Sequence, residues 1–278
     1  MAIVRTRDEV DMLRQRARVV RRHVIEMAQA AGGGYVGQGL SSADVLSAVY
    51  FRELSVDPQD LQKADRDRLL LSAAHYGMSV YAILAELGVF TREHLLTYCA
   101  DDSDLEMIAE ERTPGIEITG GSLGQGLSVG IGMAASAKLR GKSWRVYVYE
   151  SDGPCQEGQM WEAALVAAHR QLDNLCLIID ANGRQVDGRI DSVVKLEPFP
   201  EKWRAFGWHA IEIDGHDMPA ILAALDEARA TSGQPTVIIA RTIMAKGVSF
   251  LESRPNCHYV RWQPGEAEQA LAEIGEVG

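Results

Sequence analysis

Cysteine is scarce in this sequence, and its placement does not suggest paired or metal-bound sulfur. The 278 residues contain four cysteines with no CxxC pair, at Cys99, Cys155, Cys176 and Cys257. This scatter argues against a disulfide framework and against a cysteine zinc site. It favours a reducing, cytoplasmic location.

Long apolar runs are also lacking. No run approaches the ~20 apolar residues that a membrane-spanning helix needs. The first residues are charged, including Arg5 and Arg7, and no apolar core follows them, so we expect no signal peptide. We therefore expect no membrane association.

Basic residues are in deficit. Lys and Arg number 28 against 39 Asp and Glu, which gives a net charge of −11. A surface this acidic repels phosphate backbones, so we expect no nucleic-acid partner. A small anionic ligand held by one cation or a helix N-terminus remains compatible with this charge.

What is present is the composition of a globular protein with an alternating second half. A content of 46% hydrophobic and 24% charged residues excludes a disordered chain or a coiled-coil rod. Periodicity predicts strands at 145–149, 175–180, 209–213 and 236–241, with helices at 158–170 and 218–231. This alternation indicates an α/β fold, with a mostly parallel sheet and helices on both faces.

Residues 1–66 are expected to form an N-terminal helical part of one domain spanning residues 1–278. The first helix has an apolar stripe that includes Val10, Val20 and Met27. Its arginines lie largely off this stripe and are expected to face solvent: Arg14, Arg16, Arg18, Arg21 and Arg22. The glycine-rich residues 31–39 predict a loop. Residues 41–44 are expected to cap a second helix that ends near residue 52.

Further elements are expected between the N-terminal part and the alternating half. They are a short strand at 69–72, a helix at 76–87, an acidic surface loop at 99–115 and a helix of small residues ending near 139.

Polar residues follow two of the predicted strands and suggest a metal site. Asp152 and Gly153 follow the strand at 145–149, and Asn182 follows the strand at 175–180. Ligands bind beyond the carboxyl ends of parallel strands, so the two side chains converge if these strands are neighbours. A carboxylate, an amide oxygen and a backbone carbonyl suit Mg²⁺, with phosphate oxygens completing its shell. The alternative is two polar turns that cap helices.

A family resemblance bears on that choice. The run from Asp152 to Asn182 resembles the thiamine diphosphate motif, which begins Gly-Asp-Gly and ends at Asn. The Gln156-Glu157-Gly158 and Trp161-Glu162-Ala163 runs, and residues 114–126 (PGIEITGGSLGQG), are similar to transketolases in particular. Ordered matches continue at residues 40–44, 67–75 and 246–258, so the resemblance spans nearly the whole chain.

The resemblance implies roles for individual residues. Asp152, Asn182 and the carbonyl of Arg184 would bind Mg²⁺ (or Ca²⁺), and Gly153 would lie against the diphosphate. Three further residues would line the cofactor, namely Gly121, Ser122 and Leu123. The implied catalytic residues are His75 and His258, near the diphosphate and the reacting carbon, and Glu157, which would reach a subunit interface. The alternatives are a satisfied buried histidine for His75 and a surface-loop residue for His258. His169 and His209 are interpreted as structural.

The chain also departs from the transketolase pattern. Ser151 replaces the first glycine of Gly-Asp-Gly, and Tyr35 replaces a substrate-pocket histidine. A second pocket histidine is missing near Ile108, and Met244-Ala245 stands where Lys-Gly is frequent. These changes leave the acceptor of the implied two-carbon transfer open, between an aldose and a lipoyl or acyl-carrier thiol. They also leave open a non-catalytic or regulatory homologue that pairs with an active enzyme.

The length implies a partner. Complete transketolases have three domains, and this chain resembles only the diphosphate-binding one. We therefore expect a second subunit that carries the pyrimidine-binding and C-terminal domains, in an α₂β₂ heterotetramer acting on a ketose phosphate.

Overall fold

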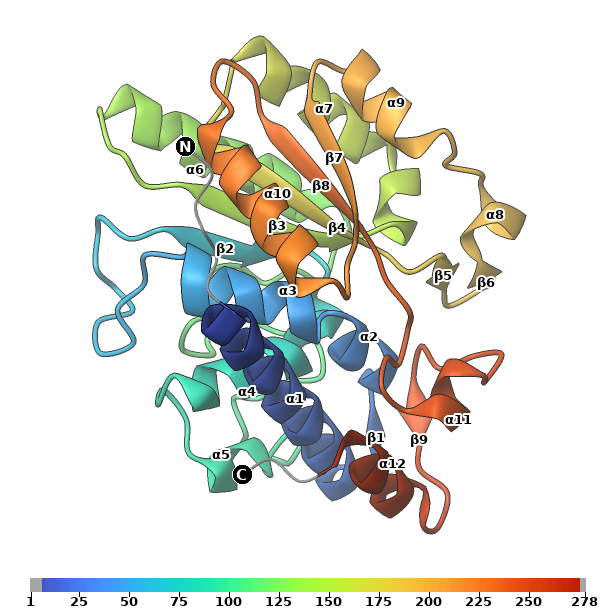
Figure 1. Cartoon of the computed structure of the whole chain (residues 1–278). Coiled ribbons are helices and arrows are strands. Elements are labelled where there is room, and N and C mark those ends of the chain that lie inside the picture. The colour runs from blue at the N-terminus through green and yellow to red at the C-terminus, as the bar shows by residue number, and fades with distance from the viewer. Residues whose placement is uncertain (1–6, 276–278) are drawn as a thin grey trace.

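A parallel five-stranded sheet forms the centre of the protein (Figure 1). The computed structural model describes residues 7–275; residues 1–6, on which part of the signal-peptide expectation rests, and 276–278 lie outside the described range. The strand order is β2-β3-β4-β8-β7. The strands are β2 (Arg68–Leu71), β3 (Val146–Ser151), β4 (Leu175–Ala181), β7 (His209–Asp214) and β8 (Thr236–Arg241). All the predicted strands are therefore present, and β3 and β4 are neighbours.

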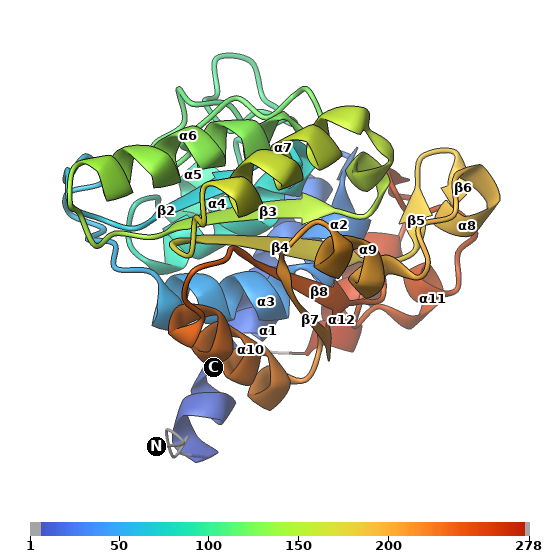
Figure 2. The same cartoon turned by 90° about the horizontal axis from the view of Figure 1, so that it is seen from above.

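Helices cover both faces of the sheet (Figure 2), which confirms the predicted α/β fold. One face packs against α6 (Gln125–Leu139), α7 (Gly158–His169) and α9 (Phe199–Ala205). The other packs against the core formed with α1 (Arg7–Ala30), α3 (Ala43–Ala48), α4 (Gly77–Glu86) and α10 (Met218–Ala230). Every residue of β3 and β4 is buried, as expected for inner strands of a doubly covered sheet.

Shorter elements connect and close this core. Two small antiparallel pairs join β1 (Gly33–Gly34) to β9 (Val260–Arg261), and β5 (Arg184–Gln185) to β6 (Gly188–Arg189). The remaining α-helices are α2 (Val36–Ser41), α5 (Arg92–Leu95), α8 (Ile190–Val193), α11 (Ser249–Glu252) and α12 (Glu266–Ile274). Within residues 7–275, no helix combines the length and apolar character that crossing a membrane requires.

The glycine-rich stretch is more ordered than the expected loop. Gly33 and Gly34 pair with β9, and α2 begins at Val36, so the expectation of a loop throughout 31–39 is wrong. These glycines permit close packing, because a Cβ on Gly37 would lie 2.3 Å from the carbonyl oxygen of Cys257. The partner segment lies at the far end of the chain, which local sequence patterns do not reveal.

The expected cap of the second helix is also absent. Ser42 precedes α3, but its backbone is helical and its side chain makes no cap hydrogen bond. Its hydroxyl instead donates back to the carbonyl oxygen of Gln38 at 2.8 Å. The helical segment then changes to a π-helical turn at Val49–Glu53.

One arginine of α1 does not face solvent. Arg14 and Arg18 are exposed as expected, whereas Arg21 is buried and forms a salt bridge with Asp44 of α3. Its Nη2 lies 2.5 Å from Asp44 Oδ2, and its Nε donates to the carbonyl oxygen of Leu40 at 3.1 Å. The expectation of a solvated face is therefore wrong for Arg21, because a buried carboxylate on a neighbouring helix compensates its charge.

Candidate active site

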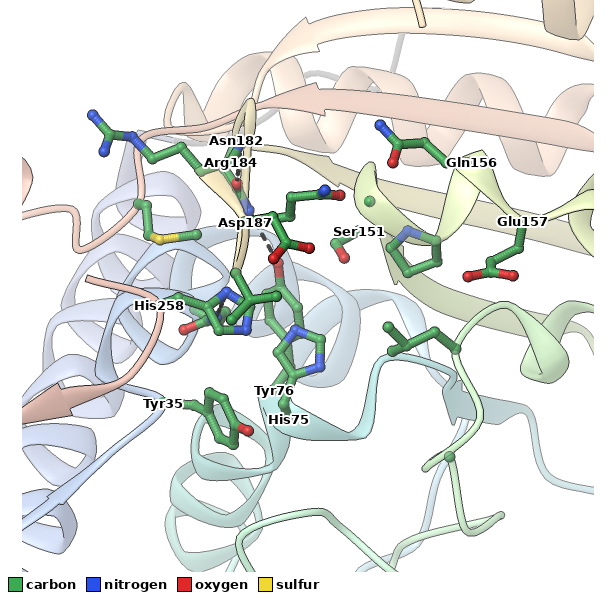
Figure 3. A pocket seen from close by; sticks show the side chains of 18 of the residues that line it. Tyr35, His75, Tyr76, Ser151, Gln156, Glu157, Asn182, Arg184, Asp187 and His258 are labelled. Carbon is green, nitrogen blue, oxygen red and sulfur yellow. Dashed lines mark hydrogen bonds between the residues drawn. The ribbon is translucent and has the colours of Figure 1, made fainter. Parts of the chain in front are cut away.

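The carboxyl ends of β3 and β4 open onto a cleft of about 510 Å³ (Figure 3). The strand register pairs Ser151 with Asp180, so Asp152 and Asn182 follow at the same edge of the sheet. Most of the predicted site residues line this cleft: His75, Gly121, Leu123, Gly153, Glu157, Asn182, Arg184 and His258. Ser122 is exposed and Asp152 is buried, and neither lines the cleft directly.

Asp152 presents an unpartnered oxygen at this edge. Its Oδ2 accepts the backbone N–H of Gly183 at 2.7 Å, whereas Oδ1 is buried without a hydrogen-bond partner in the described part of the chain. Asn182 Oδ1 accepts the backbone N–H of Arg184 at 3.0 Å. A buried acceptor without a donor is costly unless a cation or water satisfies it. The donor set of carboxylate, amide and carbonyl oxygens fits Mg²⁺.

Burial sets the protonation of Asp152. It raises the pKa of this carboxyl to about 7, with the nearby Asp180 acting in the same direction and the N–H of Gly183 opposing both. Among residues 7–275, no cluster of three or more His, Cys, Asp or Glu side chains could hold a metal. A bound cation at Asp152 would therefore depend on the amide, carbonyl and ligand oxygens for the rest of its shell.

Glycines keep one wall of the cleft open. A Cβ on Gly120 would lie 2.4 Å from the carbonyl oxygen of Leu71, so the loop lies directly on the end of β2. Gly124 has φ +77°, which turns the chain into α6. A Cβ on Gly121 would meet only Ile108 Cγ2, at 4.0 Å, and Leu123 is 38% exposed. The backbone of residues 120–124 therefore offers an accessible surface to a ligand.

Two neutral histidines and a tyrosine form another part of the cleft wall. The ring of Tyr35 lies 5.4 Å from that of His75 and 5.5 Å from that of His258, measured between centroids. Burial, and secondarily His258, lowers the pKa of His75 to about 3, and burial also lowers the pKa of His258. His258 Nδ1 lies 2.7 Å from Gln38 Nε2, so this histidine is anchored and is not a free surface-loop residue. Both rings can exchange hydrogen bonds with a ligand while uncharged.

Glu157 lies at the rim of the cleft. It is exposed and directly precedes α7, whose outward face carries Leu165 and Val166, 57% and 47% exposed. Leu123 lies nearby, because Gln159 donates to its carbonyl oxygen at 2.7 Å. His169 and His209 do not line the cleft, in keeping with their structural interpretation.

Several cleft residues were not predicted from the sequence. The β5–β6 hairpin adds Gln185, Val186 and Asp187 to the wall. Glu150 is wholly buried and does not line the cleft, but it accepts the backbone N–H groups of Gly124 and Ser151 at 3.1 and 3.0 Å. The sequence feature that could have identified Glu150 is an acidic residue at the end of an otherwise apolar strand. The hairpin offers no such signal, because its position at the cleft depends on where β4 ends in the folded sheet.

The three departures in the substrate pocket meet in this cleft. Tyr35, Ile108 and Met244 all line it, although they come from distant parts of the chain. None of these side chains bears a charge. The cleft therefore differs on this wall from a pocket built with additional histidines.

Comparisons with known proteins agree with this geometry. The family "Transketolase, thiamine diphosphate binding domain" matches residues 13–275. The chain is 39% identical over 267 residues to 6-deoxy-6-sulfo-D-fructose transketolase subunit SqwG of Clostridium sp. (strain MSTE9), covering 96% of this chain and 97% of that protein. It is 38% identical over 266 residues to one of the subunits of apulose-4-phosphate transketolase from Actinobacillus succinogenes, covering 95% of this chain and 96% of that protein.

A solved structure shows the same architecture within a longer chain. The transketolase from Campylobacter jejuni superposes with a TM-score of 0.89 at 30% identity. The match covers 95% of this chain but 43% of that chain.

Proposed function

The chain belongs to the transketolase family, as its thiamine diphosphate-binding domain, and from this membership we propose that it is one subunit of a two-chain transketolase. The observation on which this rests is the cleft itself. Gly153 and Asn182 line it and Asp152 is buried at the same sheet edge, in a chain that matches relatives named as subunits over nearly their whole length. We propose that residues 1–278 act as a single domain in this role.

The chain's own residues would hold the cofactor and its metal. Asp152, Asn182 and the carbonyl oxygen of Arg184 would bind Mg²⁺, because Asp152 offers a buried oxygen without a donor. The cofactor is proposed to lie against Gly153, along Gly121, Ser122 and Leu123. When bound, thiamine diphosphate supplies the carbanion chemistry of ketol transfer.

His75 and His258 are proposed as the catalytic residues of this subunit. Burial favours the uncharged form of both, so each ring offers one hydrogen-bond donor and one acceptor nitrogen to the reacting atoms. Their rings lie 5.4 Å apart between centroids, close enough to act on one substrate.

A partner subunit would complete the site. The relatives that are named as subunits support a partner for this chain too, and we propose that it carries the pyrimidine-binding and C-terminal domains in an α₂β₂ assembly. Glu157 lies at the cleft rim, and the exposed apolar Leu165 and Val166 lie further along α7, the helix that Glu157 precedes. This exposed face suits contact with that subunit. The buried free thiols Cys155 and Cys176 are compatible with the reducing, cytoplasmic location we propose.

The reaction proposed is transfer of a two-carbon ketol unit from a ketose phosphate. The names of the two relatives contain sugars, one of them a derivative of the ketose fructose, which supports a ketose donor. An aldose is the first candidate acceptor. The uncharged wall of Tyr35, Ile108 and Met244 favours the second candidate, a lipoyl or acyl-carrier thiol. Turnover of one ketose phosphate against aldoses, a lipoyl domain and an acyl carrier distinguishes the two.

The metal role is tested by Asp152→Ala in the complex purified after co-expression with the partner. We expect loss of ketol transfer beyond the ~10–100-fold typical of outer-shell changes at metal sites. Asp60→Ala, which removes an exposed loop carboxylate, is the matched control and should leave turnover unchanged. Undiminished turnover of Asp152→Ala would contradict the proposal and favour a non-catalytic homologue.

A further inference from the structure

A buried chain of hydrogen-bonding side chains lies beneath Asn182. At its base is the carboxylate of Asp180, which is wholly buried in β4. The hydroxyl of Ser41 donates to Asp180 Oδ2 at 2.7 Å, and the hydroxyl of Thr242 donates to Oδ1. The phenol of Tyr76 interacts with the same carboxylate. This base is held by three elements and has little freedom to move.

Tyr76 connects this base to the cleft. Its hydroxyl accepts a hydrogen bond from Asn182 Nδ2 at 3.2 Å (Figure 3). The ring is fully buried and packs against Tyr149, with centroids 5.3 Å apart. Tyr76 is therefore rigid, and only its hydroxyl reaches the amide of Asn182.

The bond from Nδ2 decides which way the carboxamide of Asn182 points. With its nitrogen on Tyr76, the amide turns its oxygen to the opposite side, where Oδ1 accepts the N–H of Arg184. A carboxamide rotated by half a turn would exchange its oxygen for an NH₂ group, which cannot bind a cation. The orientation therefore determines whether Asn182 can act as a metal ligand.

We propose that Tyr76 is a positioning residue of the metal site, whose hydroxyl fixes the Asn182 carboxamide with its oxygen toward the cation. The proposal rests on the proposed function, because it takes Asp152 and Asn182 to be the ligands. Partners outside the first coordination shell that orient ligands typically change metal affinity by ~10–100-fold when removed. Tyr76 would act in this way without touching the metal.

The test uses the Tyr76→Phe variant of the assembled complex. The change keeps the packed ring and removes the hydroxyl alone. Binding of Mn²⁺ is titrated by electron paramagnetic resonance in the presence of thiamine diphosphate. We expect Mn²⁺ affinity to fall by about tenfold. Tyr149→Phe is the control, because no hydrogen bond joins the Tyr149 hydroxyl to Asn182 in the described residues.

A second pair of variants, made in the Asn182→Asp protein, distinguishes an effect of Tyr76 on the orientation of residue 182 from an effect on the stability of the protein. In Asn182→Asp the side chain has an oxygen at both ends, so its rotation no longer matters. Tyr76→Phe should then leave Mn²⁺ affinity unchanged. Equal weakening in both backgrounds, or none in either, would overturn the role of Tyr76. Mn²⁺ binding that survives Asp152→Ala would instead overturn the metal site of the proposed function.

Discussion

At the scale of single residues, the burial of His75 affects both the chemistry of the cleft and the stability of the folded protein. Its pKa is lowered to about 3 by burial, whereas an unfolded histidine titrates near 6.5. Between these values the unfolded chain binds more protons than the folded one, so stability falls as pH falls from 6.5 toward 3. Because of His75 alone, the free energy of unfolding should fall by about 2 kcal/mol between pH 7 and pH 5.

The His75→Gln variant measures that contribution. Urea unfolding of wild type and variant at pH 7 and pH 5 should show a smaller pH-dependent loss in His75→Gln, by the same ~2 kcal/mol. Nuclear magnetic resonance of the imidazole should show no titration of His75 over this interval. A ring that titrates near pH 6.5 would contradict the neutral histidine on which its catalytic role depends.

At the scale of elements, the buried pair Arg21–Asp44 ties α1 to α3. Arg21→Ala leaves the Asp44 carboxylate buried without its guanidinium, and breaking a buried pair in this way typically costs ~3–5 kcal/mol. Arg18→Ala, on the same helix but exposed, should change the free energy of unfolding by less than about 0.5 kcal/mol. Urea unfolding at neutral pH compares the two. Similar stabilities would show that the pair contributes little.

Elements with a local signal were predicted well. The strands β3, β4 and β8 are short apolar runs, and α1 has the apolar stripe of Val10, Val20 and Met27, so their periodicity was enough. The wrong predictions concern residues whose structure depends on contacts with a segment distant in the sequence. Arg21 is buried against Asp44, and residues 33–37 pack against residues 257–261. Neither partner is visible in a local window of sequence.

The candidate site follows the same division. Asp152, Gly153 and Asn182 stand directly after strands, so strand order alone brings them together. His75 and His258 were identified through the family resemblance, and both line the cleft. Tyr76 and the β5–β6 hairpin were missed, because their contacts with Asn182 and the cleft depend on the folded position of a loop.

At the scale of the whole molecule, the exposed apolar side chains of α7 should decide assembly. Leu165 and Val166 are 57% and 47% exposed on α7, the helix that follows Glu157. If the partner covers this face, Leu165→Asp buries a charge at the interface and should weaken the complex by at least tenfold, about 1.4 kcal/mol. The isolated chain should keep its stability within about 0.5 kcal/mol, because the side chain is exposed there.

Leu139→Asp is the matched control for this face. Leu139 is 88% exposed at the end of α6 that lies away from the cleft, so the same change of chemistry should leave assembly unaffected. Sedimentation velocity of each variant with the partner subunit measures the association, and thermal unfolding of each chain alone checks the fold. Equal association of both variants would exclude this face of α7 from the interface. Selective loss with Leu165→Asp would show that the partner approaches the cleft from the side of Glu157, where a second subunit could complete the site.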